Sequence, residues 1–368
     1  MFITRRQALC RTFALGGAVL APQLAKAETA APKSAIAADP AQKLVTEQFM
    51  IDAADPGIKL YVRNKRTEDL KQFTSEKTLL FVHGATQPSE ATFDLPIEGL
   101  SWMDYIARHG WDVYLIDVRG YGQSTRPPEM DQPPASNPPV VTTDVAVKDV
   151  GSAIDFILQR RGVSKLSLMG WSWGTVIMGA YTAEHNDKVD RLVLYAPTWL
   201  RISPPPQTAP PPLGAYVAAP MATARQRLQA GAPDDSKNDL MPTSWFEAWS
   251  AAALATDPVG SKQEPPVLRS PAGVFQDNRN YWDVGKPYYD PERIKVPTLV
   301  VVSEWDKVTP ARARKRSSTS FRVVRTSGLS RSARERISSC WRRIGYSFSR
   351  RCRSSSIGRA TTDKTGCV

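Results

Sequence analysis

The strongest constraint on the fold is a series of short, continuous apolar runs that alternate with helical patterns. Each run has the length of one buried strand, and the runs lie at 78–82, 113–117, 166–169, 191–195 and 296–302. Two further strands are expected at 46–53 and 58–64, and helical patterns lie at 100–108, 142–161 and 172–184. A strand that is apolar on both sides is buried on both faces. The alternation therefore predicts an α/β fold, with a mostly parallel sheet and helices on both of its faces.

A proline-rich stretch interrupts this alternation. Pro204-Pro205-Pro206 and Pro210-Pro211-Pro212 open it, and one clear helical pattern follows at 245–255. A long insertion inside a sheet domain is typical of a cap or lid. We therefore expect a sheet core over 44–200 and 286–310, with an inserted cap over 201–285.

The net charge of +12 is concentrated at one end of the chain. Residues 311–368 contain 14 Arg, 2 Lys, 1 Asp and 1 Glu, whereas residues 1–310 contain 32 basic and 34 acidic side chains. The near-neutral core gives no reason to expect a nucleic-acid partner. The range 28–310 has no cysteine and the chain has only three histidines, so we expect no disulfide in the core, no metal and no cofactor.

The N-terminus has the pattern of an export signal. Thr4-Arg5-Arg6-Gln7-Ala8-Leu9 resembles a twin-arginine motif, 13–21 is apolar, and Ala25-Lys26-Ala27 fits an A-x-A cleavage site. The apolar run is too short to span a bilayer, so no stable membrane anchor is expected. We expect a signal peptide at 1–27, a spacer at 28–43, and a periplasmic or secreted protein.

Gly170-Trp171-Ser172-Trp173-Gly174 lies between a predicted strand and a predicted helix. In the pattern G-x-S-x-G, the chain turns so sharply that a Cβ at either glycine would collide with neighbouring backbone. Such a turn would hold the Ser172 hydroxyl above the sheet, at a helix N-terminus that stabilises negative charge. Ser172 is therefore the candidate nucleophile.

His83-Gly84-Ala85-Thr86 follows an earlier strand and is the second part of the candidate site. Acyl transfer creates an oxyanion, which fixed backbone N–H groups stabilise. We expect the amides of Trp173 and Ala85 to form this oxyanion hole. His83, Gly84 and Trp171 are expected to line the pocket, with His83 bracing the loop rather than acting as a base.

Together these segments resemble the α/β-hydrolase fold superfamily, in its serine branch with a cap. The resemblance covers 44–310 and includes Asp117-Val118-Arg119-Gly120-Tyr121-Gly122-Gln123-Ser124 and Ser303-Glu304-Trp305-Asp306-Lys307-Val308-Thr309-Pro310. It implies an activity similar to that of esterases or proline iminopeptidases. It also implies that Asp306 is the triad acid, which would orient the base and stabilise its charged form, with Glu304 as the alternative.

The same resemblance implies a catalytic histidine after Asp306, and no histidine follows Asp306 in this sequence. His109 lies on an earlier helix. His185 lies at the far end of the helix that begins at Ser172, about 20 Å away at 1.5 Å per residue. We therefore expect the base to be absent and the activity of this chain to be strongly reduced.

The segment 311–368 contains 13 Ser and 14 Arg and has no amphipathic period. It predicts an aberrant, largely disordered tail in place of the last strand and helix of a sheet domain. A basic tail that binds nucleic acid and a change of reading frame would both produce such a composition. When the third base of each codon is read with the first two of the next, codons exist that place a histidine across Arg336 and Ile337, followed by an amphipathic helix. This favours a frameshift near Arg312 to Arg316.

Aromatic residues surround the candidate nucleophile in the sequence and recur in the insertion, at Trp171, Trp173, Trp245, Phe246, Trp249, Tyr281 and Trp282. They would either line a pocket for hydrophobic groups or pack the cap itself. We expect a serine hydrolase that cleaves small carboxylic esters through an acyl-enzyme. One alternative is an iminopeptidase or amidase, with Glu247 or Asp277 holding a substrate amine. The other is a non-catalytic binding protein on the same fold.

Overall fold

The computed structural model describes residues 42–198, 208, 210–303, 305–307 and 321–326. The described residues belong to one compact unit, Ile36–Val368. The expected signal peptide, most of the expected spacer and most of the tail lie outside them. Within the described part of the chain, no helix combines the length and the apolarity that a bilayer span needs.

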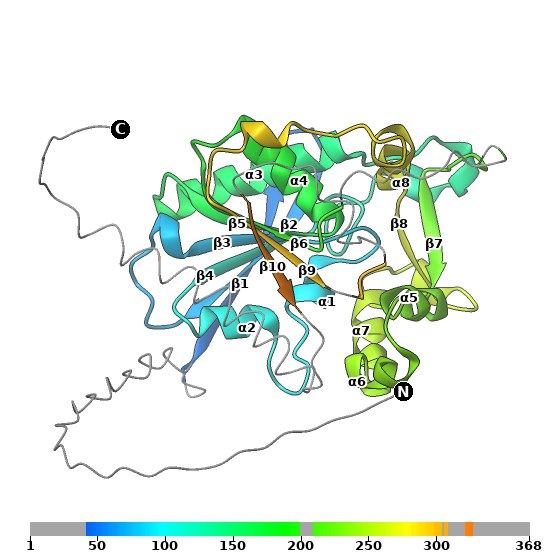
Figure 1. Ribbon diagram of the computed structural model, residues 1–368, viewed down its shortest axis with the longest axis horizontal. Coiled ribbons are helices and arrows are strands. Elements are labelled where there is room, and N and C mark those ends of the chain that lie inside the picture. Colours follow the sequence, from blue (N-terminus) through cyan, green and yellow to red (C-terminus); the bar gives the residue numbers. More distant parts are fainter. Residues whose placement is uncertain (1–41, 199–207, 209, 304, 308–320, 327–368) are drawn as a thin grey trace, which may run out of the picture. The chain divides into compact units, whose positions relative to one another are not determined.

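The described core is built on an eight-stranded sheet in the order β1-β2-β4-β3-β5-β6-β9-β10 (Figure 1). β2 pairs antiparallel with β1 and β4, and the remaining neighbours are parallel. The strands are β1 Leu44–Asp52, β2 Lys59–Thr67, β3 Thr78–Val82, β4 Asp112–Ile116, β5 Leu166–Trp171, β6 Val189–Tyr195, β9 Thr298–Ser303 and β10 Phe321–Thr326. The predicted mostly parallel sheet is confirmed.

Helices cover both faces of this sheet. α3 and α4 lie on one face and α2 lies on the other (Figure 1). Leu80 and Val82 of β3 join the buried cluster that includes α3 and α4, whereas Leu79 and Phe81 join the cluster that includes α2. Successive side chains of a strand point to opposite faces, which is why the central strands are apolar throughout. The core helices are α1 Ser89–Phe93, α2 Trp102–Ala107, α3 Thr143–Arg161 and α4 Trp173–Glu184.

The segment between β6 and β9 contains more regular structure than the single helix that the sequence predicted. Its elements are β7 Tyr216–Pro220, α5 Met221–Leu228, α6 Lys237–Leu240, α7 Thr243–Leu254, β8 Val267–Pro271 and α8 Gly273–Asp277. β7 and β8 form a two-stranded antiparallel sheet in which Tyr216 pairs with Pro271. Each strand is short and ends in proline, and its partner is distant in sequence, so local periodicity gave no sign of this pairing.

β10 corrects the prediction that no strand follows Pro310. Phe321 to Thr326 pair in parallel register with Thr298 to Ser303 of β9. The prediction rested on the composition of 311–368 as a whole, which hid one short run of aromatic and β-branched residues with good strand propensity. A pattern compatible with the sheet therefore continues past Arg312 to Arg316.

Candidate active site

The bend between β5 and α4 holds Ser172 at φ 53° and ψ −116°, a backbone conformation rare for a residue with a side chain. Two glycines make the bend possible. A Cβ on Gly170 would lie 2.1 Å from the carbonyl oxygen of Gly174, and a Cβ on Gly174 would lie 2.6 Å from that of His83. The sharp turn expected from G-x-S-x-G is therefore present.

Backbone hydrogen bonds hold Ser172 in this conformation. Its amide donates to the carbonyl oxygen of Tyr195 at 2.9 Å, and its own carbonyl oxygen accepts from the amide of Thr175 at 2.9 Å. The side chain is partly exposed, and no described residue makes a hydrogen bond to its hydroxyl. Because α4 begins at the next residue, this hydroxyl lies at a helix N-terminus, where negative charge is stabilised.

The loop after β3 lies against this bend. A Cβ added to Gly84 would be 3.0 Å from the Cβ of Ser172. His83 is buried, with its Nδ1 donating to the carbonyl oxygen of Gly84 at 2.7 Å and its Nε2 accepting from the amide of Val118 at 3.1 Å. Burial lowers the pKa of His83 to about 4, so the ring stays neutral near pH 7. Both ring nitrogens are occupied, and neither is free to take a proton from Ser172.

The two amides expected to form the oxyanion hole lie on the segments that meet at Ser172. Ala85 follows Gly84 in the loop after β3 and is partly exposed. Trp173 is the first residue of α4, so its amide has no acceptor within the helix. Thr86, the next loop residue, has φ 66°, which strains a β-branched side chain.

The Trp173 side chain is held by a buried network that the sequence did not reveal. Its indole Nε1 donates to Thr143 Oγ1 at 2.9 Å, and the Thr143 hydroxyl donates to Asp277 at 2.6 Å. The same carboxylate accepts from the amide of Thr143 at 2.7 Å. Asp277 is 4% exposed and is occupied by these contacts. It is therefore not placed to hold a substrate amine, as the iminopeptidase hypothesis required.

The loop after β4 is ordered by buried carboxylates. Asp117 accepts from the amides of Ser89 at 2.7 Å and Gln123 at 3.1 Å. Burial raises the pKa of Asp117 to about 6. Arg119 pairs with the buried Asp149 of α3, and its Nε lies 2.9 Å from one carboxylate oxygen. Asp149 had no local signal in the sequence because it was one of several acidic residues on a predicted helix.

Asp306 lies at the same edge of the sheet as Ser172. Trp171 at the end of β5 pairs with Tyr195 of β6, and Tyr195 pairs with Val301 of β9. The carboxyl ends of these parallel strands meet at one edge, and Asp306 follows the end of β9 by three residues. Asp306 is partly exposed. Glu304, the alternative acid, lies outside the described residues.

Residues 77–324 match the family model described as the alpha/beta hydrolase fold. The chain belongs to this family. No curated protein sequence matches it. Among solved structures, a laboratory-evolved variant of potato epoxide hydrolase is 15% identical, with a TM-score of 0.55 over 83% of this chain and 99% of that one.

Two other solved structures are similar at a lower score. A thermophilic esterase from Thermogutta terrifontis is 16% identical, with a TM-score of 0.49 over 82% of this chain and 99% of that one. A serine hydrolase involved in carbazole degradation is 19% identical, also with a TM-score of 0.49, over 83% of this chain and 98% of that one. At such identities, likeness to a solved structure concerns the fold alone.

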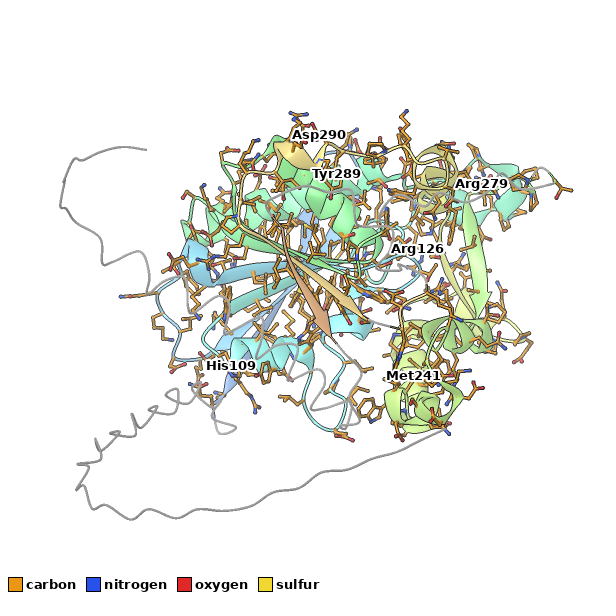
Figure 2. The ribbon with its side chains drawn as sticks, in the orientation of Figure 1. His109, Arg126, Met241, Arg279, Tyr289 and Asp290 are labelled. Carbon is orange, nitrogen blue, oxygen red and sulfur yellow. The ribbon has the colours of Figure 1, made fainter. Side chains whose placement is uncertain are left out.

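None of the three histidines of this α/β hydrolase is placed as the base. Both ring nitrogens of His83 are already hydrogen-bonded, as described above. His109, labelled in Figure 2, follows α2 on the amino-terminal side of β4. Its Nδ1 donates to the carbonyl oxygen of Tyr105 at 2.6 Å. His185 follows the far end of α4, with its ring 4.5 Å from that of Tyr181.

The aromatic residues of the insertion divide between two environments. Trp282 is 1% exposed and packs in the same cluster as α3 and α4, so it does not line a pocket. Trp249 of α7 lines a cavity beside Thr86. Glu247 is exposed on α7 and does not line that cavity. Among the described residues, no cluster of three His, Cys, Asp or Glu side chains could hold a metal ion.

Proposed function

We propose that this α/β hydrolase is a serine hydrolase that cleaves carboxylic esters through an acyl-enzyme. One observation carries the proposal: Ser172 lies on a strained bend beside the loop after β3, and its partly exposed hydroxyl has no hydrogen-bond partner among the described residues. In the proposed reaction the Ser172 oxygen attacks the ester carbonyl, and the amides of Ala85 and Trp173 stabilise the oxyanion. The bond to the alcohol then breaks, and water hydrolyses the acyl-enzyme.

The proposed mechanism lacks a general base in this chain. A serine hydroxyl is a weak nucleophile until a base takes its proton, and the sequence contains no histidine after Asp306. Asp306 would orient such a base if one were supplied. We therefore expect very slow turnover that added imidazole accelerates, because a diffusible base can enter the partly exposed site.

Fluorophosphonate labelling tests the nucleophile directly. The full chain should be labelled on the peptide that contains Ser172, faster with imidazole than without it, and Ser172→Ala should reduce labelling to background. Ser167→Ala is the matched control, because Ser167 lies on β5, which ends just before Ser172, and its buried hydroxyl has no hydrogen-bond partner among the described residues. A label on other residues, or none on Ser172 even with imidazole, would contradict the proposal and favour a non-catalytic binding protein.

The iminopeptidase or amidase alternative has no observation in its favour. Asp277 is occupied by Thr143, and Glu247 lies away from the cavity beside Thr86. We expect a p-nitrophenyl ester to react faster than a proline naphthylamide in the presence of imidazole. A faster reaction with the proline naphthylamide would instead favour the iminopeptidase or amidase.

The origin of the missing base is a separate proposal. We propose that the gene carries a change of reading frame, and that the restored frame contains a histidine. The pairing of β10 with β9 counts against a change as early as Arg312 to Arg316, because a sheet-compatible pattern continues through Thr326. Sequencing the 3′ end of the gene tests the idea, and an unbroken frame without a recoverable histidine would refute it.

Export through a twin-arginine signal is also a proposal, since 1–27 lies outside the described residues. Fractionation of cells that express the full chain should place the protein in the periplasm or the medium. Replacement of Arg5 and Arg6 by lysine should retain it in the cytoplasm if the signal operates as proposed.

A further inference from the structure

A small, partly open cavity lies where the insertion meets the loop after β3. Its walls are mostly apolar, with Met221, Trp249 and Leu268 contributed by the insertion. Thr86 closes it on the side of the core, and Arg227 of α5 is its charged residue. Ser172 is not among the lining residues, so the cavity lies beside the nucleophile bend rather than over it.

Arg227 has the features of an anion-binding residue. Its Nη2 donates to Thr86 Oγ1 at 2.5 Å, and no described carboxylate pairs with it. Much of the side chain is exposed on α5, but the guanidinium end reaches into the site, where burial lowers its pKa. A guanidinium carries five donors in a planar fork that matches a carboxylate, and the described contacts of Arg227 use only one side-chain acceptor.

Tyr121 adds a second polar group at the same place. It is 2% exposed, and its hydroxyl lies beside two donors, the backbone amide of Thr86 and the guanidinium of Arg227. Its own O–H has no hydrogen-bond acceptor among the described residues. This O–H and the guanidinium can therefore both donate to a ligand oxygen.

We propose that Arg227 binds a carboxylate of the substrate, and that the esters cleaved at Ser172 are monoesters of dicarboxylic acids. The inference rests on the proposed hydrolase function. The free carboxylate would accept from Arg227, while the carbon chain would contact Met221, Trp249 and Leu268. The chemistry at the ester is unchanged, and Arg227 acts by selecting and positioning the substrate.

The spacing fits a short diacid. The backbone of Gly84 contacts Ser172, and Thr86 lies two residues further along, a span of at most about 7 Å. The guanidinium bonded to Thr86 is therefore at most roughly 15 Å from the Ser172 hydroxyl. A carboxylate and an ester separated by about four methylene groups can lie within that limit.

Calorimetric titration with monoethyl adipate and diethyl adipate tests the proposal. The full chain carrying Ser172→Ala is used, so that binding is measured without hydrolysis. We expect the monoester to bind about tenfold more tightly than the neutral diester at low salt, and this preference to disappear in Arg227→Gln. Arg227→Lys should retain part of it, because the charge remains while the planar fork is lost.

Arg225→Gln is the matched control. Arg225 lies on the same helix and contacts Phe246 and Thr243, away from the cavity, so its loss should leave the monoester preference intact. Equal binding of the two adipates, or a preference that survives Arg227→Gln in a folded protein, would overturn the proposal. Neither outcome would change the fluorophosphonate labelling of Ser172. The monoester proposal can therefore be refuted while the proposed hydrolase function stands, and the labelling experiment tests that function independently.

Discussion

Thr143 joins groups that lie far apart in the sequence. It accepts from the indole of Trp173 and donates to Asp277, which is 134 residues away. These contacts hold the first residue of α4, whose amide is a proposed oxyanion donor. The sharp bend at Ser172 could be predicted from a local motif, but the contacts of Thr143 could not, because they depend on partners that only the fold brings together.

We predict that Thr143→Val lowers the free energy of unfolding by about 2 kcal/mol. Valine has nearly the same shape but leaves the buried indole N–H without an acceptor and removes one donor from Asp277. Urea unfolding measures the effect. Thr142→Val is the control, because the hydroxyl of Thr142 contacts Asp144 at the surface and should contribute less than about 0.5 kcal/mol. Similar losses for the two variants would contradict the network.

The buried carboxyl of Asp117 predicts a dependence of stability on pH. Its pKa is raised from 3.8 to about 6, so the folded state holds this proton more tightly than the unfolded state does. The protonated Asp117 carboxyl makes its full contribution to the free energy of unfolding below about pH 4, and this contribution is lost as the pH rises through about 6. The shift corresponds to roughly 2–3 kcal/mol.

Comparison with Asp117→Asn isolates that dependence, because the amide does not titrate. The stability of the wild type relative to Asp117→Asn should fall by about 2 kcal/mol between pH 4.5 and pH 7.5 in urea unfolding. A constant difference across this range, or one that grows with pH, would show that the carboxyl is not desolvated as described.

At the scale of elements, the bend between β5 and α4 depends on glycines whose missing side chains leave room for backbone. Gly174 is packed against the carbonyl oxygens of Val82 and His83, so strand, bend and loop are fixed together. The sequence predicted this unit because strand, motif and helix are contiguous. It did not predict β7 with β8, or β10, because pairing between distant short strands leaves no periodic pattern.

We predict that Gly174→Ala destabilises the protein by about 3 kcal/mol or more, since its Cβ would lie 2.6 Å from the carbonyl oxygen of His83. Gly151→Ala is the contrasting variant. It lies within α3, where the nearest atom to the new Cβ is 3.4 Å away, and alanine should be neutral or stabilising by about 0.5 kcal/mol. Thermal unfolding compares them, and a tolerated Gly174→Ala would refute the close packing of the bend.

At the scale of the whole described unit, buried charged groups connect the insertion to the core. Arg269 of β8 pairs with the fully buried Asp257 and also donates to the carbonyl oxygen of Met130 at 2.7 Å. Arg126 of the core, which is labelled in Figure 2, donates to the carbonyl oxygen of Thr256 at 2.7 Å. The core architecture could be predicted from apolar patterning. These contacts could not, because charged residues in a proline-rich stretch carry no sign of which ones are buried.

We predict that Arg269→Ala lowers the free energy of unfolding by about 3–5 kcal/mol, because it leaves the Asp257 carboxylate buried without its partner. Arg293→Ala breaks a surface pair with Glu184, in which both side chains are 54% exposed, and should cost less than about 1 kcal/mol. Urea unfolding and limited proteolysis of the insertion distinguish them. Equal, small effects would mean that the buried pair does not anchor the insertion.

The conformation at position 172 is imposed by the main chain around it, through Tyr195, Thr175 and the two flanking glycines. Among the described residues, none forms a hydrogen bond with the side chain at this position. A single codon change could therefore install a thiol or a carboxylate in place of the alcohol without rebuilding the scaffold. The same backbone could therefore present different nucleophiles without a change of fold.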